Sequence, residues 1–336
     1  MSMIPRVPVK PGNNVAELLD GMAQTGFQGR KLGEAYRIWK QMIEDPDAYI
    51  MLGLSGAMVP AGMQECLISL VTNRYIDMIV STGANIFHDI CEHCGVHHYL
   101  GHHHVDDKAL YEQGIDRIYD VFAYEEEFRV VDNAISDFAE SLNGFSGSSS
   151  LFLKQLGLWL VERYPHGRSL TATAAVEGVP ILVPALTDSS IGIGLVIARR
   201  RGVDISVDQI QDADDITQIV EKQKRTGVVY VGGGVPKNFI QQTQVIADIH
   251  SVECGGHDYA IQFTTDTPHF GGLSGCTFDE AISWGKEALD CKQVQCFCDA
   301  TIALPIVLSG LVGSNTVRAL ATSRGGGKTP ANGGSK

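Results

Sequence analysis

Short hydrophobic runs alternate along this chain with longer stretches whose apolar residues recur at helical spacing. The short runs predict strands at 49–54, 76–81, 180–185, 228–231, 259–263 and 294–298. The longer stretches predict helices at 63–73, 125–142, 149–164, 191–200, 213–224, 238–249, 277–289 and 303–319. This alternation is typical of an α/β fold with a Rossmann-like, mostly parallel sheet and helices on both faces.

The two ends of the chain differ from the rest. Residues 1–14 are rich in proline, glycine and asparagine, and residues 324–336 (RGGGKTPANGGSK) hold too few apolar side chains to order themselves. We expect a flexible N-terminal segment, a single domain at 15–323 and a disordered tail at 324–336. With 336 residues and 44% hydrophobic content, the chain can bury a sizeable core.

A glycine triplet at 232–234 follows one predicted strand and precedes a predicted helix. Backbone without side chains can come close to a phosphate, and the N-terminus of a helix favours anions. The triplet is not a G-x-G-x-x-G fingerprint, so its spacing alone leaves a tight turn as an equal alternative.

Two aspartates stand near the carboxyl ends of predicted strands, where α/β sheets bind ligands. Asp188 and Asp299 could hold ribose hydroxyls there. Because a helical pattern follows each of them directly, their position alone favours a helix N-cap for each.

Lys286 lies in the run TFDEAISWGKEALDCKQVQCFCDA at 277–300. Thr277 and Glu280 form a capping box, which predicts a helix from Thr277 to about Leu289 with little charge near Lys286. Desolvation lowers the pKa of a lysine and makes it a nucleophile able to form an imine. A lysine that extends to solvent from a core-facing helix is the alternative.

Glu280 and Trp284 are four residues apart, hence on one face of the predicted helix. An indole beside a carboxylate can bind an alkylammonium through cation–π attraction and a charge-assisted hydrogen bond. A core tryptophan and a capping glutamate are the alternative.

The runs DEAISWGK, VYVGGGVPK, VPALTDSS and CDATIALP resemble those of deoxyhypusine synthase and its relatives in order and spacing. The resemblance continues through LVTNRYIDMIVSTGA and HYLGHHHVDDKALYEQGIDRIYDVF and covers nearly all of 50–311. It implies an NAD-dependent transferase that oxidises an amine to an imine and hands an aminobutyl group to a lysine. The group then passes to an acceptor amine, and the same nicotinamide reduces the product, so no net redox change occurs. The resemblance also implies a homotetramer with sites at subunit interfaces.

The resemblance assigns roles residue by residue. Lys286 matches the imine-forming lysine of that family, and Glu280 and Trp284 match its amine-binding residues. The positions that match NAD contacts are Thr82, Asp188, Gly233, Gly234, Thr265, Asp299 and Ala300.

Several amine anchors of that family are changed in this chain. Two adjacent carboxylates become Phe87 and His88, two aspartates become Ile193 and Leu273, and a histidine becomes Asn238. A site that keeps the cofactor loops and the lysine but alters the pocket should run the same reaction on different amines. We therefore expect the bacterial deoxyhypusine synthase-like branch, homospermidine synthase-like enzymes that act on small polyamines such as putrescine. His88 or Asn238 would supply new polar contacts, and modification of a translation-factor lysine is the alternative.

Charge and cysteines bear on partners and location. The formal net charge of −13 argues against nucleic acid and suits cationic amines. We find no apolar run of membrane-spanning length and no hydrophobic leader, and so expect no membrane partner. The eight cysteines are scattered, as suits a reducing cytosol, so we expect a cytoplasmic protein.

A cluster between Cys91 and His104 has the ligand types of a zinc site. Its members are Cys91, His93, Cys94, His97, His98, His102, His103 and His104. The resemblance aligns this region with a segment that binds no metal, so we expect none. A zinc protein and a catalytically silent NAD-binding protein stay open as alternatives.

Overall fold

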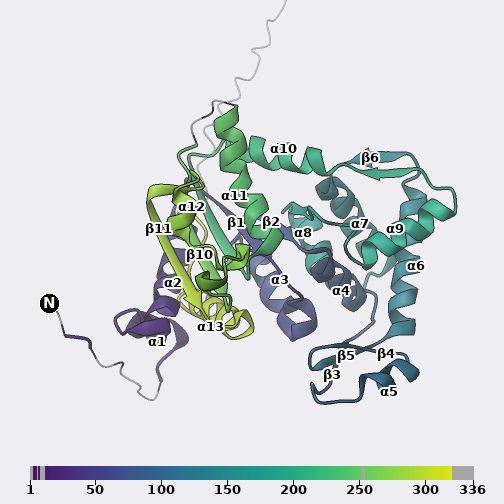
Figure 1. The fold of residues 1–336 in the computed structure, drawn as a ribbon, viewed down its shortest axis with the longest axis horizontal. Coiled ribbons are helices and arrows are strands. Elements are labelled where there is room, and N and C mark those ends of the chain that lie inside the picture. Colours follow the sequence, from purple (N-terminus) through teal and green to yellow (C-terminus); the bar gives the residue numbers. More distant parts are fainter. Residues whose placement is uncertain (1–2, 6, 8–11, 251, 253, 320–336) are drawn as a thin grey trace, which may run out of the picture.

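This computed structural model describes residues 3–5, 7, 12–250, 252 and 254–319. Its framework is a six-stranded parallel sheet (Figure 1). The strand order is β11-β10-β9-β1-β2-β7, and every neighbouring pair is parallel. The strands are β1 (Ala48–Leu54), β2 (Met78–Ser81), β7 (Ile181–Leu182), β9 (Arg225–Val231), β10 (His257–Thr264) and β11 (Glu287–Phe297). Each overlaps one of the six predicted strands, so the predicted α/β fold is confirmed.

Helices cover both faces of this sheet, which is why its strands are apolar on both sides. Leu52 and Val229 point into a core shared with one group of helices, whereas Met51 and Val228 point into a second core. The first group is α1 (Val15–Met22), α2 (Phe27–Glu44), α3 (Gln64–Thr72) and α13 (Ala300–Gly313). The second group is α10 (Gln209–Val220), α11 (Gly234–Ile249) and α12 (Phe278–Ile282).

The order of the strands reverses between β1 and β9. The chain first builds β1, β2 and β7 toward one side, then returns to place β9, β10 and β11 on the other side of β1. In open α/β sheets ligands bind at such a switch point, beyond the carboxyl ends of the strands. Here the hydroxyl of Ser55, just after β1, donates a hydrogen bond to the carbonyl of Gly233, just after β9.

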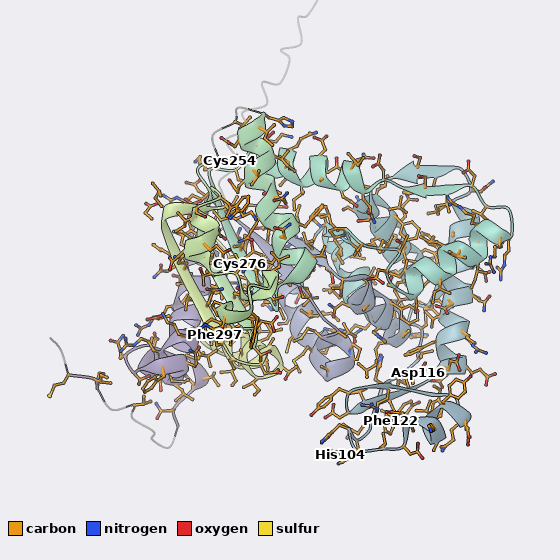
Figure 2. The ribbon with its side chains drawn as sticks, viewed as in Figure 1. His104, Asp116, Phe122, Cys254, Cys276 and Phe297 are labelled. Carbon is orange, nitrogen blue, oxygen red and sulfur yellow. The ribbon has the colours of Figure 1, made fainter. Side chains whose placement is uncertain are left out.

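Beyond β7 lies a helical part with two small sheets. Its helices are α4 (Gly83–His93), α6 (Glu125–Ser141), α7 (Ser149–Arg163), α8 (Leu170–Glu177) and α9 (Ser190–Arg200). One of the small sheets is formed by β6 (Phe145–Gly147), which pairs with β8 (Ile205–Val207). A lobe projects beside one end of α6, marked by His104, Asp116 and Phe122 (Figure 2). It consists of β3 (Tyr99–Leu100), α5 (Asp107–Glu112), β4 (Ile115–Ile118) and β5 (Val121–Tyr124). Short helical turns complete the fold at η1 (Val59–Met63), η2 (Pro268–Phe270) and η3 (Leu273–Gly275).

Seven of the eight predicted helices are present, as α3, α6, α7, α9, α10, α11 and α13. The prediction for 277–289 is wrong beyond Ile282. Thr277 caps α12 as predicted, accepting a hydrogen bond from the Glu280 amide, but Gly285 adopts a left-handed conformation with φ 69°. The chain then joins β10 as strand β11, because backbone pairing along that edge outweighs the short helical pattern.

The ends of the chain are only partly described. Half of the predicted flexible segment at 1–14 falls outside the described residues, and the predicted tail at 324–336 falls wholly outside them. Among the described helices, none is long and apolar enough to cross a bilayer.

Candidate active site

Lys286 lies in the turn between α12 and β11. Its amide donates a hydrogen bond to the Ala281 carbonyl at 3.1 Å, and its carbonyl accepts one from the His257 amide at 3.0 Å. The turn depends on Gly285, whose positive φ an L side chain rarely adopts. The backbone of Lys286 is therefore held between α12 and β10.

The amine of Lys286 is held by two side chains. Its Nζ donates a hydrogen bond to Oδ1 of Asn238, on α11, at 3.1 Å, and lies 5.5 Å from the ring centroid of Trp284. The lysine is half-buried. Its side chain therefore packs against α11 instead of extending freely into solvent.

A hollow of about 250 Å³ opens beside this amine. It is lined by Pro268, Gly271, Gly272, Leu273, Cys276, Glu280, Ala281, Trp284 and Lys286. Glu280 and Trp284 thus face one space, although Trp284 lies past the end of α12. In the view of Figure 2, Cys276, one of the lining residues, lies between Cys254, before β10, and Phe297, at the end of β11.

The glycine loop adjoins this hollow. Gly232 and Gly234 have positive φ values of 75° and 54°. A Cβ on Gly233 would lie 2.5 Å from the Cα of Ser274, so only glycine fits there. The Gly234 amide donates to the Ser274 hydroxyl at 3.0 Å, while the neighbouring Leu273 lines the hollow. The turn η3 therefore connects the N-terminus of α11 with the surroundings of Lys286.

The other candidate cofactor residues lie beyond the carboxyl ends of the sheet strands: Thr82 after β2, Asp188 in the β7–α9 loop, Thr265 after β10, and Asp299 and Ala300 after β11. Because the sheet is parallel, these positions share one edge. The Thr82 hydroxyl caps α4 and donates to the Gly56 carbonyl at 2.8 Å.

The two aspartates differ in their local roles. Asp299 is the N-cap of α13 and accepts from the Thr301 amide at 2.8 Å, so the capping interpretation is confirmed for this residue. Asp188 does not cap α9, because Ser189 holds the N-cap position, and its side chain is exposed. An exposed carboxylate that no helix end uses remains available to a ligand.

Within one chain, His88 lies apart from the Lys286 hollow. Its Nδ1 is 2.9 Å from Nε2 of His98, whose Nδ1 is 2.7 Å from a carboxylate oxygen of Glu92. Its ring also packs edge-on against Phe128. Burial, reinforced by the neighbouring His98, lowers the pKa of His88 to about 4. His88, on α4, is therefore a neutral imidazole that contacts His98 and lies away from the lining of the hollow.

The cysteines and histidines between Cys91 and His104 point to different places. Cys91 is buried in the core, and the ring nitrogens of His93 lie 2.8 Å from the Ser169 hydroxyl and 3.1 Å from the Leu160 carbonyl. The rings of His102, His103 and His104 gather in the projecting lobe. In the described part of the chain, no group of three or more His, Cys, Asp or Glu side chains could hold a metal ion.

The expectation of little charge near Lys286 is wrong. Glu287 is 2% exposed, and its Oε1 accepts from Nε2 of Gln241 at 2.7 Å. Lys237 is also buried and donates to Oε1 of Gln262 at 3.0 Å and to the Cys276 carbonyl at 2.6 Å. Burial lowers the pKa of Lys237 and raises the pKa of Glu287 to about 7. The signals in the sequence are charged residues at the carboxyl ends of two otherwise uncharged runs, SWGKE and GGGVPK.

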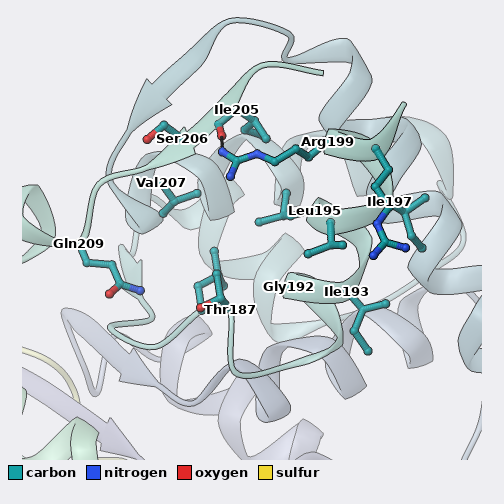
Figure 3. Close-up of a pocket in the computed structure, with 13 residues that line it drawn as sticks. Thr187, Gly192, Ile193, Leu195, Ile197, Arg199, Ile205, Ser206, Val207 and Gln209 are labelled. Atoms are coloured by element: carbon teal, nitrogen blue, oxygen red, sulfur yellow. Dashed lines mark hydrogen bonds between the residues drawn. The ribbon is translucent and has the colours of Figure 1, made fainter. Parts of the chain in front are cut away.

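A second, apolar hollow of about 560 Å³ lies between α9 and β8 (Figure 3). Thr187, next to Asp188, lines it together with Ile193, one of the positions at which this chain departs from the resembled family. Arg199 crosses its wall and donates to the Ile205 carbonyl at 2.9 Å. This hollow therefore borders the β7–α9 loop and not Lys286.

Comparisons with known proteins agree on one family. The sequence profile of deoxyhypusine synthase matches residues 17–311. The chain is 58% identical over 308 residues to "Probable deoxyhypusine synthase 2" of Methanosarcina acetivorans, covering 91% of this chain and 89% of that protein. It is 38% identical over 299 residues to the "Deoxyhypusine synthase-like protein" of Chlorobaculum tepidum, covering 88% and 85%.

A solved structure shares the fold. It is the crystal structure of a candidate deoxyhypusine synthase from Entamoeba histolytica, with a TM-score of 0.64 and 20% identity, covering 91% of this chain and 96% of that one. The match spans the helical part as well as the parallel sheet. The chain therefore belongs to the deoxyhypusine synthase family, whose members are aminobutyl transferases.

Proposed function

We propose that this enzyme is an NAD-dependent aminobutyl transferase that uses Lys286 as its covalent nucleophile and acts on small amines, as homospermidine synthases do. One observation carries the proposal. The Lys286 amine lies between Asn238 and Trp284 in a hollow that also contains Glu280 and adjoins the glycine loop.

The residues of the sheet edge fit a dinucleotide. A Cβ at Gly233 would collide with Ser274. Gly233 supplies no side-chain cap and the Ser274 hydroxyl takes only the Gly234 amide, so a phosphate could approach the amides that remain at the N-terminus of α11. The exposed Asp188 carboxylate suits a ribose hydroxyl, and Thr82, Thr265, Asp299 and Ala300 share its edge. When bound, NAD would accept hydride from the donor amine carbon and return it at the end of the cycle.

The chain's own residues would perform the transfer. Glu280 and Trp284 would hold the ammonium end of the donor by a charge-assisted hydrogen bond and cation–π attraction. Neutral Lys286 would attack the oxidised carbon, expel the small amine and retain the four-carbon fragment as an imine. The acceptor amine would then displace Lys286. Asn238 would orient the Lys286 lone pair through the hydrogen bond that it already makes.

The composition of the hollow supports short amines. Glu280 is the one carboxylate in its lining, and Leu273 supplies an apolar wall. Phe87, which replaces another acidic anchor, is buried in the core. A hollow with one carboxylate can pair with one ammonium group. It therefore suits a short amine better than a long polyamine that carries several positive charges.

A second candidate is a deoxyhypusine synthase that modifies a translation-factor lysine. The name of the 58%-identical relative favours it. We further propose a single catalytic domain at 15–323, a cytoplasmic location and a homotetramer. In such an assembly, His88 would contact the amine site of a neighbouring subunit.

The test is incubation of the full chain with NAD and putrescine, spermidine, agmatine or a translation-factor precursor, with products identified by mass. Borohydride reduction during turnover should fix an aminobutyl group on Lys286. Lys286→Ala should lose both product and adduct, whereas Lys292→Ala, on the neighbouring strand β11, should keep both. An adduct on another lysine, or NAD binding without any turnover, would reject the proposal.

A further inference from the structure

Lys286 and the next residue, Glu287, are bound by two side chains one turn apart on α11. Asn238 accepts from Lys286 Nζ at 3.1 Å, and Gln241 donates to Glu287 Oε1 at 2.7 Å. Residues three apart lie on one face of a helix. The lysine and the carboxyl are therefore supported side by side, with the carboxyl on the buried side.

The surroundings of Glu287 contain unused polar atoms. Its Oε2, Oε1 of Gln241 and the Tyr230 hydroxyl are fully buried, and each lacks a hydrogen-bond partner within the described residues. A protonated carboxyl carries an O–H donor that such acceptors could use, whereas an ionised carboxyl carries none. An ionised Glu287 would instead be stabilised by the cations of Lys237 and Lys286. The site thus accommodates either form of this carboxyl.

Other titratable groups surround Glu287. They come from each element packed against it: Lys237 on α11, Tyr230 on β9, His257 on β10, Cys291 on β11, and Lys286 in the turn. Burial raises the pKa of Cys291 to about 12, raises that of Tyr230 and lowers that of His257 to about 3. Glu287, with its pKa raised to about 7 by burial, is therefore the carboxyl that changes charge beneath Lys286.

We propose that Glu287 is a positioning residue that sets how readily Lys286 gives up its proton, through their adjacent supports on α11. The inference rests on the proposed role of Lys286 as nucleophile and deepens it. When Glu287 is neutral, the Lys286 ammonium faces the exposed carboxylate of Glu280 and the cation of Lys237 but no buried anion. Loss of its proton is then favoured relative to the state in which Glu287 is ionised. When Glu287 is ionised, its charge stabilises that ammonium and the lysine is less nucleophilic.

The test measures Lys286 itself, without NAD or substrate. The full chain is labelled with limiting acetic anhydride across a pH series, and the acetylation rate of each lysine is read by peptide mass. In Glu287→Gln, Lys286 should label like wild type near pH 5.5 and about threefold or more faster near pH 8.5, where the wild-type carboxyl is ionised. Lys292 should label alike in both proteins.

Two variants make the result specific. Glu221→Gln removes the same charge from the end of α10 and should reproduce the wild-type profile. Gln241→Met removes a hydrogen bond that lowers the pKa of Glu287, so the slowing of Lys286 should begin at higher pH than in wild type. Gln241→Met also tests the inference by itself if Glu287→Gln fails to fold.

Profiles of Lys286 that superimpose in wild type, Glu287→Gln and Gln241→Met would overturn the inference. The proposed function fails differently, by absence of amine transfer and of a borohydride-fixed adduct. Because labelling requires neither, the two failures are distinguishable.

Discussion

At the scale of single residues, Trp284 is a position where ligand binding and stability can be measured separately. Its indole is 66% exposed, so it buries little area, yet it lines the hollow and lies 5.5 Å from Lys286 Nζ. The free energy of unfolding depends on buried area, whereas attraction of a cation depends on the ring face.

We therefore expect Trp284→Ala to change the free energy of unfolding in urea by less than about 1 kcal/mol while raising the KM for the donor amine about tenfold. Trp284→Phe should recover part of that affinity because it keeps a ring. Steady-state kinetics and urea titration on the same preparations measure both. A KM that stays at the wild-type value in Trp284→Ala would remove the indole from the amine site.

Asp89 is the opposite case, a buried carboxylate with a structural role. It accepts from the Leu170 and Thr171 amides at 2.7 Å each and from Gln64 Nε2 at 2.8 Å, so it holds the start of α8 against α4. The group is fully buried. A buried donor that loses its acceptor is left without a hydrogen bond, so the folded state carries the full desolvation free energy of that donor.

Asp89→Asn should lower the free energy of unfolding by about 2–4 kcal/mol, because an amide presents N–H groups where donors already point. Asp208→Asn, at the exposed cap of α10, should lower it by about 1 kcal/mol or less. Chemical denaturation of the two variants measures the difference. Equal losses would mean that burial does not amplify the role of Asp89.

At the scale of elements, the turn between α12 and β11 delivers Lys286 to its place. Gly285 has φ 69° with open space around a Cβ, so a side chain there would meet strain but no collision. Gly178, which ends α8 with φ 71°, is equally open and lies far along the chain. The two glycines share one conformation, but only Gly285 directly precedes the candidate nucleophile.

Gly285→Ala and Gly178→Ala should each lower the free energy of unfolding by about 1–2 kcal/mol. Only Gly285→Ala should also reduce borohydride-fixed adduct on Lys286, because relaxation of that turn moves the lysine away from Asn238. Peptide mass after reduction measures the adduct in each variant. Full adduct in Gly285→Ala would show that the turn does not set the lysine's position.

At the scale of the whole molecule, a buried histidine makes stability depend on pH. Burial lowers the pKa of His257 to about 3 from an ordinary 6.5. As pH falls below 6.5 the unfolded chain takes up this proton and the folded chain does not, so stability falls between about pH 6.5 and pH 3. Glu287 acts oppositely: its raised pKa destabilises the fold as pH rises from 4.5 toward 7.

His257→Gln should reduce the slope of the free energy of unfolding against pH by the contribution of about one proton. That contribution is roughly 1.4 kcal/mol per pH unit between about pH 4 and pH 6. Urea denaturation at several pH values gives the slope for wild type and variant. Thr226→Val, which removes the hydroxyl 2.8 Å from His257 Nδ1 but keeps the histidine, should retain the slope. Parallel curves for wild type and His257→Gln would contradict the assignment.

The sequence by itself determined the six-stranded framework and the edge on which the candidate cofactor residues stand. Strand and helix periods are local properties, and parallel strands necessarily place their carboxyl ends together. Hence the sequence alone predicts that Asp188, the glycine triplet and Asp299 share an edge of the sheet. The two- to four-residue strands of the projecting lobe were missed, since such short segments carry no readable period.

Tertiary structure decided how the helix predicted at 277–289 ends and what lies beneath Lys286. A local pattern cannot weigh a capping box against pairing with β10, which is why strand β11 displaced the predicted helix. Nor can it show that Lys237 and Gln241, over 40 residues away along the chain, pack around Glu287. Burial of charge depends on contacts between distant segments, and only the folded chain brings those segments together.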